Sequence, residues 1–531
     1  MKAFLMYPDR DFDPLQLLSR RERNSRAKDQ NVNLKQILPS NEAALTQDLG
    51  LDILFNAMAL DDNFLFEVAT IALLAGVTDP QIILYRQPIL EDCTRNEAIV
   101  REMYQVACEA ITEERKHYWG SFIRYPSSTL HQAVDVLQML IGKLTRLRRI
   151  ADHHAEHFQS DGITRLFAML ETELSDEYFA TIEQHLKRLQ FRNGVLVSAQ
   201  LGMGNKATNY VLRKPRHDQR NWIARLLQRP PGYKFHLHPR DEAGGQALAT
   251  LQNQGINHVA NASAQSADHI VSFFQMLRTE LAFYVGCLNL KRKLDGMGAP
   301  TCFPVPAPFE QRKLSFSGLY DVCLTLSMKR KAVGNDLNAD GKDLIVITGA
   351  NSGGKSTFIR SLGVGQLMMQ AGMFVAAENF SADVRDGIFT HYRREEDAAM
   401  ESGKLDEELS RMSGIVDTLS RRSMVLFNES FAATNEREGS EIAAQITNAL
   451  LESGVKVSFV THLYEFARRL YDEKKSNAVF LRAERLPDGT RTFRLIQADP
   501  LQTSYGKDVY EAEFGSERTR PIQRQPLPAA E

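Results

Sequence analysis

The sequence predicts a mixed α and α/β fold, in which a helical first half with a small β-containing insertion precedes a P-loop nucleotide-binding domain. Three observations lead to this prediction. Apolar residues recur every three or four positions through most of residues 36–192, as on the buried face of amphipathic helices. Short β-like runs separated by Gly, Pro and Asn follow between 193 and 260. A G-x-x-x-x-G-K-S motif then occupies residues 349–356, between an apolar run and a helical pattern.

Composition is that of an ordinary globular protein. The 531 residues are 43% hydrophobic and 24% charged, with a net charge of -2, so a case for nucleic-acid binding must come from local charge. The sequence has no secretion signal and no uninterrupted apolar run of about eighteen residues, and we expect no membrane partner. The cysteines lack C-x-x-C spacing, which favours reduced structural thiols and a cytoplasmic location.

The first half begins with a basic extension and continues as a helical body. Residues 1–35 carry Arg20, Arg21 and Lys28 among other cations, a pattern typical of a mobile arm or of a solvated connector, and we favour the connector. The apolar periodicity of residues 36–192 predicts the helical body. Within it, the segment 131–150 has an apolar stripe at helical spacing, which we interpret as core: Leu137, Leu140, Ile141, Leu144 and Leu147.

The short β-like runs of residues 193–260 predict a small insertion in this body. The insertion contains a basic cluster. Between 211 and 240 the only acid is Asp218, and aromatic residues are interleaved with the cations. Such a cluster either neutralises a phosphate backbone or forms a solvated surface loop, and composition favours neither. The candidate DNA-binding residues are Arg213, Lys214, Arg216, Arg220, Arg225 and Arg229.

The second half opens with a helix and a proline-rich stretch. Helical periodicity returns at about Ser266 and runs to Leu294, and prolines between 300 and 308 predict a linker, so we assign 261–312 to a returning helix and linker. Residues 313–515 form the nucleotide-binding domain. Residues 516–531, rich in Pro, Gln and Arg, predict a disordered tail.

The glycine-rich motif predicts a phosphate-binding loop at a helix N-terminus. Residues 343–348 are typical of a buried strand, and a helix is expected from Thr357 to Met369. Lys355 is placed to reach the β- and γ-phosphates of ATP or GTP, and the Ser356 hydroxyl is placed for Mg²⁺. The candidate nucleotide-binding residues are Gly349, Ala350, Asn351, Ser352, Gly353, Gly354, Lys355, Ser356 and Thr357.

Two further apolar runs end in polar residues. Residues 423–429 end in Asn428 and Glu429, and residues 457–460 lead into His462. Because parallel strands bring their carboxyl ends to one edge of a sheet, we expect one crevice around the γ-phosphate. There Glu429 would orient or activate the attacking water and His462 would contact the terminal phosphate. The candidate catalytic residues are Lys355, Glu429 and His462, and the candidate metal residues are Ser356 and Asn428.

Several motifs occur in a fixed order through the second half. They are TGANSGGKST (348–357), FVAAENF (374–380), IFT (388–390), MVLFNES with FAATNEREGSEIA (424–443), THLYEF (461–466) and SYG (504–506). On these motifs the chain resembles the MutS family of DNA mismatch repair ATPases. Weaker similarity extends upstream to Asp79-Pro80, Tyr85-Arg86-Gln87 and Leu90-Glu91-Asp92.

The resemblance implies an architecture and a partner. A helical core and lever, interrupted by a clamp at 193–260, would precede an ABC-type P-loop ATPase domain that forms a homodimer. A signature segment of one subunit would complete the partner's nucleotide site, and Ser402 is the candidate contact in trans. Residues 405–409, LDEEL, depart from the family's usual Ser-Thr-Phe-Met run at this place.

Other departures from the family pattern bear on function. Asn428 replaces the usual Walker B Asp, and a neutral amide brings no charge to Mg²⁺, so we expect slow ATP hydrolysis. Val333 lies where the family usually offers an aromatic to the base, and is the candidate base contact. The helical core begins about 36 residues into the sequence, so we expect no mismatch-reading or connector domain. After the SYG motif we expect no Smr nuclease domain.

Our leading hypothesis is an ATPase that acts as a dimeric, nucleotide-gated clamp on duplex or branched DNA in repair or recombination, without mismatch reading of its own. Other DNA repair proteins are further candidate partners. Two alternatives remain: a nucleotide-gated scaffold with little hydrolysis, and a clamp on structured RNA or a ribosome.

Overall fold

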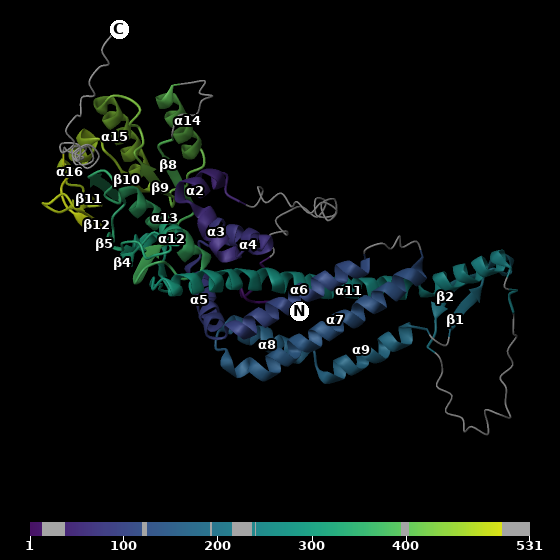
Figure 1. The fold of residues 1–531 in the computed structure, drawn as a ribbon. Helices are drawn as coiled ribbons and strands as arrows, with labels where there is room; N and C mark the ends of the chain where they lie inside the picture. Colours follow the sequence, from purple (N-terminus) through teal and green to yellow (C-terminus); the bar gives the residue numbers. More distant parts are fainter. Residues whose placement is uncertain are drawn as a thin grey trace, which may run out of the picture. The chain divides into compact units, whose positions relative to one another are not determined.

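The computed structural model describes residues 1–12, 38–118, 125–191, 194–214, 236–238, 240–394 and 403–501. The fold is mixed α and β and divides into two compact units (Figure 1). The first unit contains Met1–Phe12 and Arg95–Leu281, and the second contains Asp13–Thr94 and Ala282–Glu531. Among the described helices, none combines the length and apolar character needed to cross a lipid bilayer.

The first unit is mainly helical. Its elements are α6 (Glu97–Tyr118), α7 (Pro126–His154), η2 (Ala155–His157), α8 (Asp161–Glu173), α9 (Asp176–Leu189), β1 (Val197–Leu201), η3 (Met203–Asn205), β2 (Ala207–Leu212) and most of α11 (Glu242–Gly296). Helix α7 packs against α6, α8 and α9 (Figure 1). The five apolar residues of its predicted stripe are all buried, which confirms that prediction. On its polar side Lys143 pairs with Glu109 and Glu113 of α6.

The N-terminal residues are part of this first unit. Leu5 and Met6 are buried. The Glu280 carboxylate of α11 accepts hydrogen bonds from the backbone N–H groups of Leu5 at 2.7 Å, Met6 at 3.1 Å and Phe12 at 2.8 Å. Burial raises the pKa of Glu280 to about 7. Arg20, Arg21 and Lys28 of the predicted extension lie outside the described residues.

The predicted insertion contains an antiparallel hairpin, β1 with β2, followed by the start of α11. That helix begins at Glu242 and not near Ser266, because three glycines and many polar residues obscure its apolar period. One of these glycines, Gly255, is needed for packing, since a Cβ there would lie 2.7 Å from the Val197 side chain of β1. Of the candidate DNA-binding residues, Arg213 and Lys214 follow β2 and are exposed, whereas the other four (Arg216, Arg220, Arg225 and Arg229) lie outside the described residues.

The second unit contains two sheets. A six-stranded sheet has the order β12-β11-β6-β10-β9-β8, and all its neighbours are parallel except β11 and β12. Its strands are β6 (Leu344–Gly349), β8 (Ile388–Tyr392), β9 (Met424–Asn428), β10 (Lys456–Val460), β11 (Ala478–Arg485) and β12 (Arg491–Gln497). The predicted parallel arrangement of the three motif-bearing strands, β6, β10 and β9, is therefore confirmed.

The second sheet has the order β3-β7-β4-β5. Its strands are β3 (Val305–Ala307), β4 (Leu314–Leu319), β5 (Asn335–Asn338) and β7 (Asn379–Asp383), with the short helix η4 (Phe309–Gln311) between the first two. The proline-rich stretch that we expected to be a linker thus contributes a strand. Pro306 is compatible with this because β3 lies at the edge of the sheet, where a proline need not donate to a second neighbour.

Helix α13 packs against strands of both sheets and against other helices of the second unit. The helices are α2 (Glu42–Leu49), α3 (Leu51–Ala59), α4 (Asn63–Leu74), α5 (Pro80–Arg95), α12 (Val322–Met328), α13 (Lys355–Ala371), α14 (Lys404–Val416), α15 (Glu436–Glu452) and α16 (Tyr464–Asp472). Arg86 of α5 is buried and donates to the Ala371 carbonyl at 2.9 Å. Gly372 leaves room for it, since a Cβ there would lie 2.7 Å from the Arg86 side chain.

Candidate nucleotide-binding site

The glycine-rich loop joins β6 to α13 and has the backbone of an anion-binding turn. Gly349 and Gly354 have φ of 110° and 92°, values that favour glycine. Gly353 has no room for a side chain, because a Cβ there would lie 2.7 Å from the Ala483 Cβ. Helix α13 begins at Lys355, directly after this turn. The first N–H groups of the helix therefore point toward the loop, where they favour negative charge.

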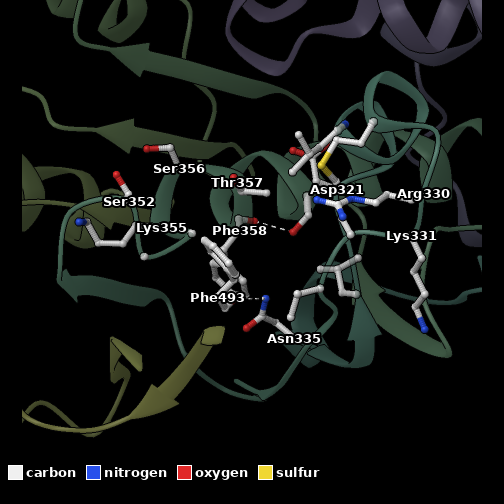
Figure 2. Close-up of a pocket in the computed structure, with 18 of the residues that line it drawn as sticks. Asp321, Arg330, Lys331, Asn335, Ser352, Lys355, Ser356, Thr357, Phe358 and Phe493 are labelled. Carbon is white, nitrogen blue, oxygen red and sulfur yellow. Dashed lines mark hydrogen bonds between the residues drawn. The ribbon is translucent and has the colours of Figure 1, made fainter. Parts of the chain in front are cut away.

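A cavity of about 570 Å³ lies beside this loop (Figure 2). The loop and the start of α13 form one side, and Glu429 also lines it. Residues of α12, the segment after it, β5 and β12 also line the cavity. They include Met328, Arg330, Lys331, Val333, Asn335 and Phe493. Val333, the predicted base contact, is 41% exposed and does line the cavity. The volume is in the range of ordinary small-molecule sites.

Lys355 is buried at the base of the loop. Its side chain is 5% exposed, and Nζ donates to the carbonyl oxygens of Gly349 at 3.0 Å and Ala350 at 2.9 Å. Burial lowers the pKa of Lys355 to about 8, although the charge of Glu429 opposes this shift. An anion in the cavity would supply the charge that the buried ammonium group lacks.

The two candidate metal residues are in contact. The Ser356 hydroxyl donates to Asn428 Oδ1 at 3.0 Å, so the start of α13 meets the carboxyl end of β9. Both groups are neutral oxygen donors, and Mg²⁺ prefers oxygen ligands while retaining waters and phosphate oxygens. This donor set fits a weakly held Mg²⁺ that depends on nucleotide phosphates for its negative ligands.

Glu429 and His462 form a pair at the ends of β9 and β10. His462 Nε2 lies 2.8 Å from Glu429 Oε1, and each side chain is 31% exposed. The hydrogen bond from His462 is the largest effect that holds the pKa of Glu429 below its usual range. Glu429 is therefore ionised at neutral pH. Such a carboxylate can orient a water molecule, but it is a weak proton acceptor.

Three residues of the site were not identified from the sequence. Phe493 of β12 lines the cavity and is 49% exposed, so it offers the aromatic surface that Val333 does not. Asn335 holds it in place by accepting from Leu495 N–H at 2.7 Å and donating to Phe493 O at 3.4 Å. Arg491 donates to the Asn351 carbonyl of the loop at 2.7 Å. No motif marks these residues. The pairing of β12 with β11 brings Phe493 and Arg491 to the loop, and Asn335 reaches them from β5.

The structure brings most of the predicted site residues to one place. Residues 349–357, Val333, Asn428, Glu429 and His462 all lie on or beside the cavity, with Asn428 reaching it through Ser356 and His462 through Glu429. Ser402 lies outside the described residues. Arg213 and Lys214 belong to the first unit.

The fold and the site define an α/β protein in which a glycine-rich loop, a buried lysine and a strand-end carboxylate surround one cavity. Two family models match the chain: the one described as MutS2 N-terminal domain matches residues 78–297, and the one described as MutS domain V matches residues 345–518. The chain therefore belongs to the MutS family.

Curated relatives agree with this assignment. The DNA mismatch repair protein MutS of Thermotoga neapolitana is 36% identical over 193 residues, which are 34% of this chain and 23% of the relative. The protein of the same name from Thermus thermophilus is 30% identical over 179 residues, which are 34% of this chain and 22% of the relative. The DNA mismatch repair protein MSH3 of Arabidopsis thaliana is 37% identical over 154 residues, 28% of this chain and 14% of the relative. The chain thus matches less than a quarter of each of these relatives.

Proposed function

We propose that this chain is an ATPase that binds ATP and Mg²⁺ in the cavity beside the glycine-rich loop. The observation that supports this most directly is the convergence of Lys355, Ser356 and Glu429 on one cavity. These residues lie within the region that matches MutS domain V. Relatives of this chain are named DNA mismatch repair proteins, which makes ATP turnover coupled to DNA the function that the site supports best.

In this proposal each residue of the cavity has a separate role. The loop N–H groups and Lys355 hold the phosphates, and Ser356 with Asn428 holds Mg²⁺, which would neutralise phosphate charge. Glu429 orients the attacking water. His462 fixes the Glu429 carboxylate before the reaction and would contact the terminal phosphate. The base lies between Val333 and Phe493, where the aromatic ring provides a stacking surface.

Replacing Asn428 with Asp is expected to raise ATP turnover, by about tenfold. The added charge would strengthen the hold on Mg²⁺ next to the Ser356 hydroxyl, 3.0 Å from the present amide oxygen. The measurement is turnover against Mg²⁺ concentration, in which the Asp variant should also reach half-saturation at less Mg²⁺. Asn448→Asp, on α15, is the matched control. An unchanged rate and Mg²⁺ dependence would contradict the role given to Asn428.

The neutral Asn428 also supports a second candidate function. With no charged strand-end group beside Ser356, the site could retain ATP without useful hydrolysis, and the protein would be a nucleotide-gated scaffold. Nucleotide binding and turnover of the unsubstituted chain separate the two functions. A scaffold binds nucleotide but turns it over too slowly to detect, whereas an ATPase shows measurable turnover.

For the rest of the chain we propose the architecture implied by the resemblance. Residues 36–192 form a helical core and lever, 193–260 a clamp, and 313–515 an ABC-type ATPase domain that forms a homodimer, with Ser402 contacting the partner's nucleotide. Exposed Arg213 and Lys214 beside the β1-β2 hairpin support a clamp that contacts phosphates. A cytoplasmic location is supported by the buried thiols Cys93, Cys287 and Cys323, whose pKa values are raised by burial and which are suited to a structural role.

Binding to DNA is expected to depend steeply on salt and little on mismatches. If the clamp neutralises three or more phosphates, the logarithm of the association constant should fall with a slope of about -3 or steeper against the logarithm of salt concentration. The measurement is a salt titration with matched and mismatched duplex, branched DNA and structured RNA. Combined Arg213→Ala and Lys214→Ala substitution should reduce the slope, whereas Lys342→Ala in the ATPase region should not. A mismatch preference of about tenfold, 1.4 kcal/mol, or stronger binding to RNA would contradict the proposal.

A further inference from the structure

We propose that Glu408 and Ser430 are positioning residues that hold the turn carrying Glu429, so that its carboxylate faces the nucleotide cavity. The inference rests on the proposed ATPase function for its catalytic meaning. Its geometry is independent of that function. Neither residue lines the cavity, and neither was given a chemical role from the sequence, although Ser430 is the last residue of the MVLFNES motif.

The turn after β9 has an unfavourable backbone. Glu429 has φ of 57° and Phe431 has φ of 61°, so two non-glycine residues, separated by one position, lie in the left-handed region. Each such residue is less stable there than in the right-handed conformation, because its Cβ approaches the following carbonyl oxygen. A conformation of this kind persists only where surrounding contacts hold it. The Glu429 N–H donates to the Val460 carbonyl at 2.9 Å, which fixes the first residue of the turn to β10.

Glu408 holds the far end of the turn. It projects from α14, is 6% exposed, and its Oε2 accepts the Phe431 N–H at 2.7 Å. A buried carboxylate that accepts a backbone N–H makes a stronger hydrogen bond than a neutral acceptor does. Removing this acceptor would leave the buried Phe431 N–H unpaired, which is unfavourable in a protein interior. We therefore expect the turn to change conformation when this acceptor is removed.

Ser430 holds the middle of the turn. It is fully buried, its hydroxyl donates to the His391 carbonyl, and its Oγ lies 2.8 Å from His391 Nδ1. The other ring nitrogen, Nε2, lies 3.0 Å from the Glu408 carbonyl. Burial lowers the pKa of His391 to about 4, so the ring is neutral. Its single proton lies on Nε2, because the backbone carbonyl of Glu408 can only accept. Nδ1 is then an acceptor, and it shares the Ser430 hydroxyl proton with the His391 carbonyl.

The same imidazole also packs on the turn. Its ring stacks on Phe431 with centroids 5.2 Å apart and planes 20° from parallel. Glu408, His391 and Ser430 thus form one connected group, which fixes the turn from α14 and β8. Only Glu429, at the head of that turn, points from it into the cavity.

The decisive variants are Glu408→Ala and Glu408→Gln. Alanine removes the acceptor, whereas the glutamine amide oxygen can still accept the Phe431 N–H. We expect Glu408→Ala to lower kcat for ATP by about 10- to 100-fold, because a small displacement of a catalytic group has effects of that size, while KM changes by less than about twofold. Glu408→Gln should recover most of the loss. Asp406→Ala, at an exposed position on the same helix, is the control and should match the unsubstituted protein.

Ser430→Ala is the second test of the same group. It should lower kcat in the same manner, and its effect should be less than additive with that of Glu408→Ala, because both act on one turn. Thermal unfolding of each variant establishes that the fold is retained. If Glu408→Ala does not fold, the comparison of Ser430→Ala with Glu408→Gln still decides the proposal.

Amide hydrogen exchange at Phe431 tests the hydrogen bond to Glu408 separately from its effect on ATP turnover. The amide should be protected in the unsubstituted protein and in Glu408→Gln, and should exchange at least about tenfold faster in Glu408→Ala. Absence of ATP turnover in the unsubstituted protein would defeat the proposed ATPase, while exchange would still test the hydrogen bond. Unchanged exchange in folded Glu408→Ala, or faster exchange with unchanged kcat, would overturn the positioning role.

Discussion

Replacing Lys355 with Met should raise the dissociation constant for ATP by at least about 100-fold. The methionine keeps the aliphatic volume in a position that is 5% exposed, so the fold should be retained. What is lost is a buried positive charge whose present partners are two loop carbonyls. Removing one partner of a buried, hydrogen-bonded charge pair typically costs about 2–5 kcal/mol, which corresponds to roughly 30-fold to several thousand-fold in affinity.

The measurement is a titration of ATP binding at fixed Mg²⁺, followed by calorimetry or a fluorescent nucleotide. Lys342→Ala is the control, because it removes a lysine in the same unit, just before β6, and leaves the cavity intact. Equal ATP affinity of Lys355→Met and the unsubstituted protein would show that nucleotide does not bind at this loop.

The state of Lys355 also fixes the pH dependence of binding. Burial lowers its pKa to about 8, and a bound phosphate would favour the protonated form. ATP binding should therefore be strongest below pH 8 and weaken by up to about tenfold per pH unit above it. In Lys355→Met this dependence should disappear, which the same titration at several pH values can check.

Replacing Glu429 with Gln should lower ATP turnover by about 100- to 1000-fold and leave ATP affinity within about threefold. The substitution keeps the shape of the side chain and a possible contact with His462, 2.8 Å away, but removes the charge that orients water. Losses of this size are typical when a general base or water-positioning group is removed. Unchanged affinity with a lower rate marks an interaction that matters mainly in the transition state.

Single-turnover kinetics with pre-bound ATP would measure this effect on the chemical step. Glu452→Gln, at the end of α15, is the matched control for loss of one carboxylate. A Glu429→Gln variant that retained more than about a third of the normal rate would mean that another group orients the water. His462→Ala would then become the next substitution to examine.

The sequence predicted the centre of the second unit well, and the reasons are local. The strands that became β6, β9 and β10 are continuous apolar runs of the kind that parallel, doubly covered strands require, and each ends in polar residues. The loop before Lys355 could be predicted because Gly349 and Gly354 have positive φ, a backbone conformation that favours glycine. Parallel pairing then sufficed to bring Ser356, Asn428 and Glu429 together.

Other parts of the site depend on contacts between distant segments. Phe493 reaches the cavity only because β12 turns back on β11, and its alternating strand pattern resembles that of many edge strands. The hydrogen bond from Phe431 to Glu408 joins residues 23 positions apart through a turn whose left-handed residues are not glycines. No local sequence pattern predicts such a turn. The early start of α11 at Glu242 was missed because glycine at position 255 is used for packing against Val197 and not for ending the helix.

The most direct test of the proposed function is ATP turnover by this 531-residue chain, with and without duplex, branched and mismatched DNA. It should be measured at low salt and at about 0.15 M, where long-range charge interactions are screened. We expect slow turnover that DNA of several shapes stimulates, more strongly at low salt, and that Glu429→Gln abolishes. ATP binding without turnover, and without any response to DNA, would contradict the proposed DNA-coupled ATPase and favour the nucleotide-gated scaffold.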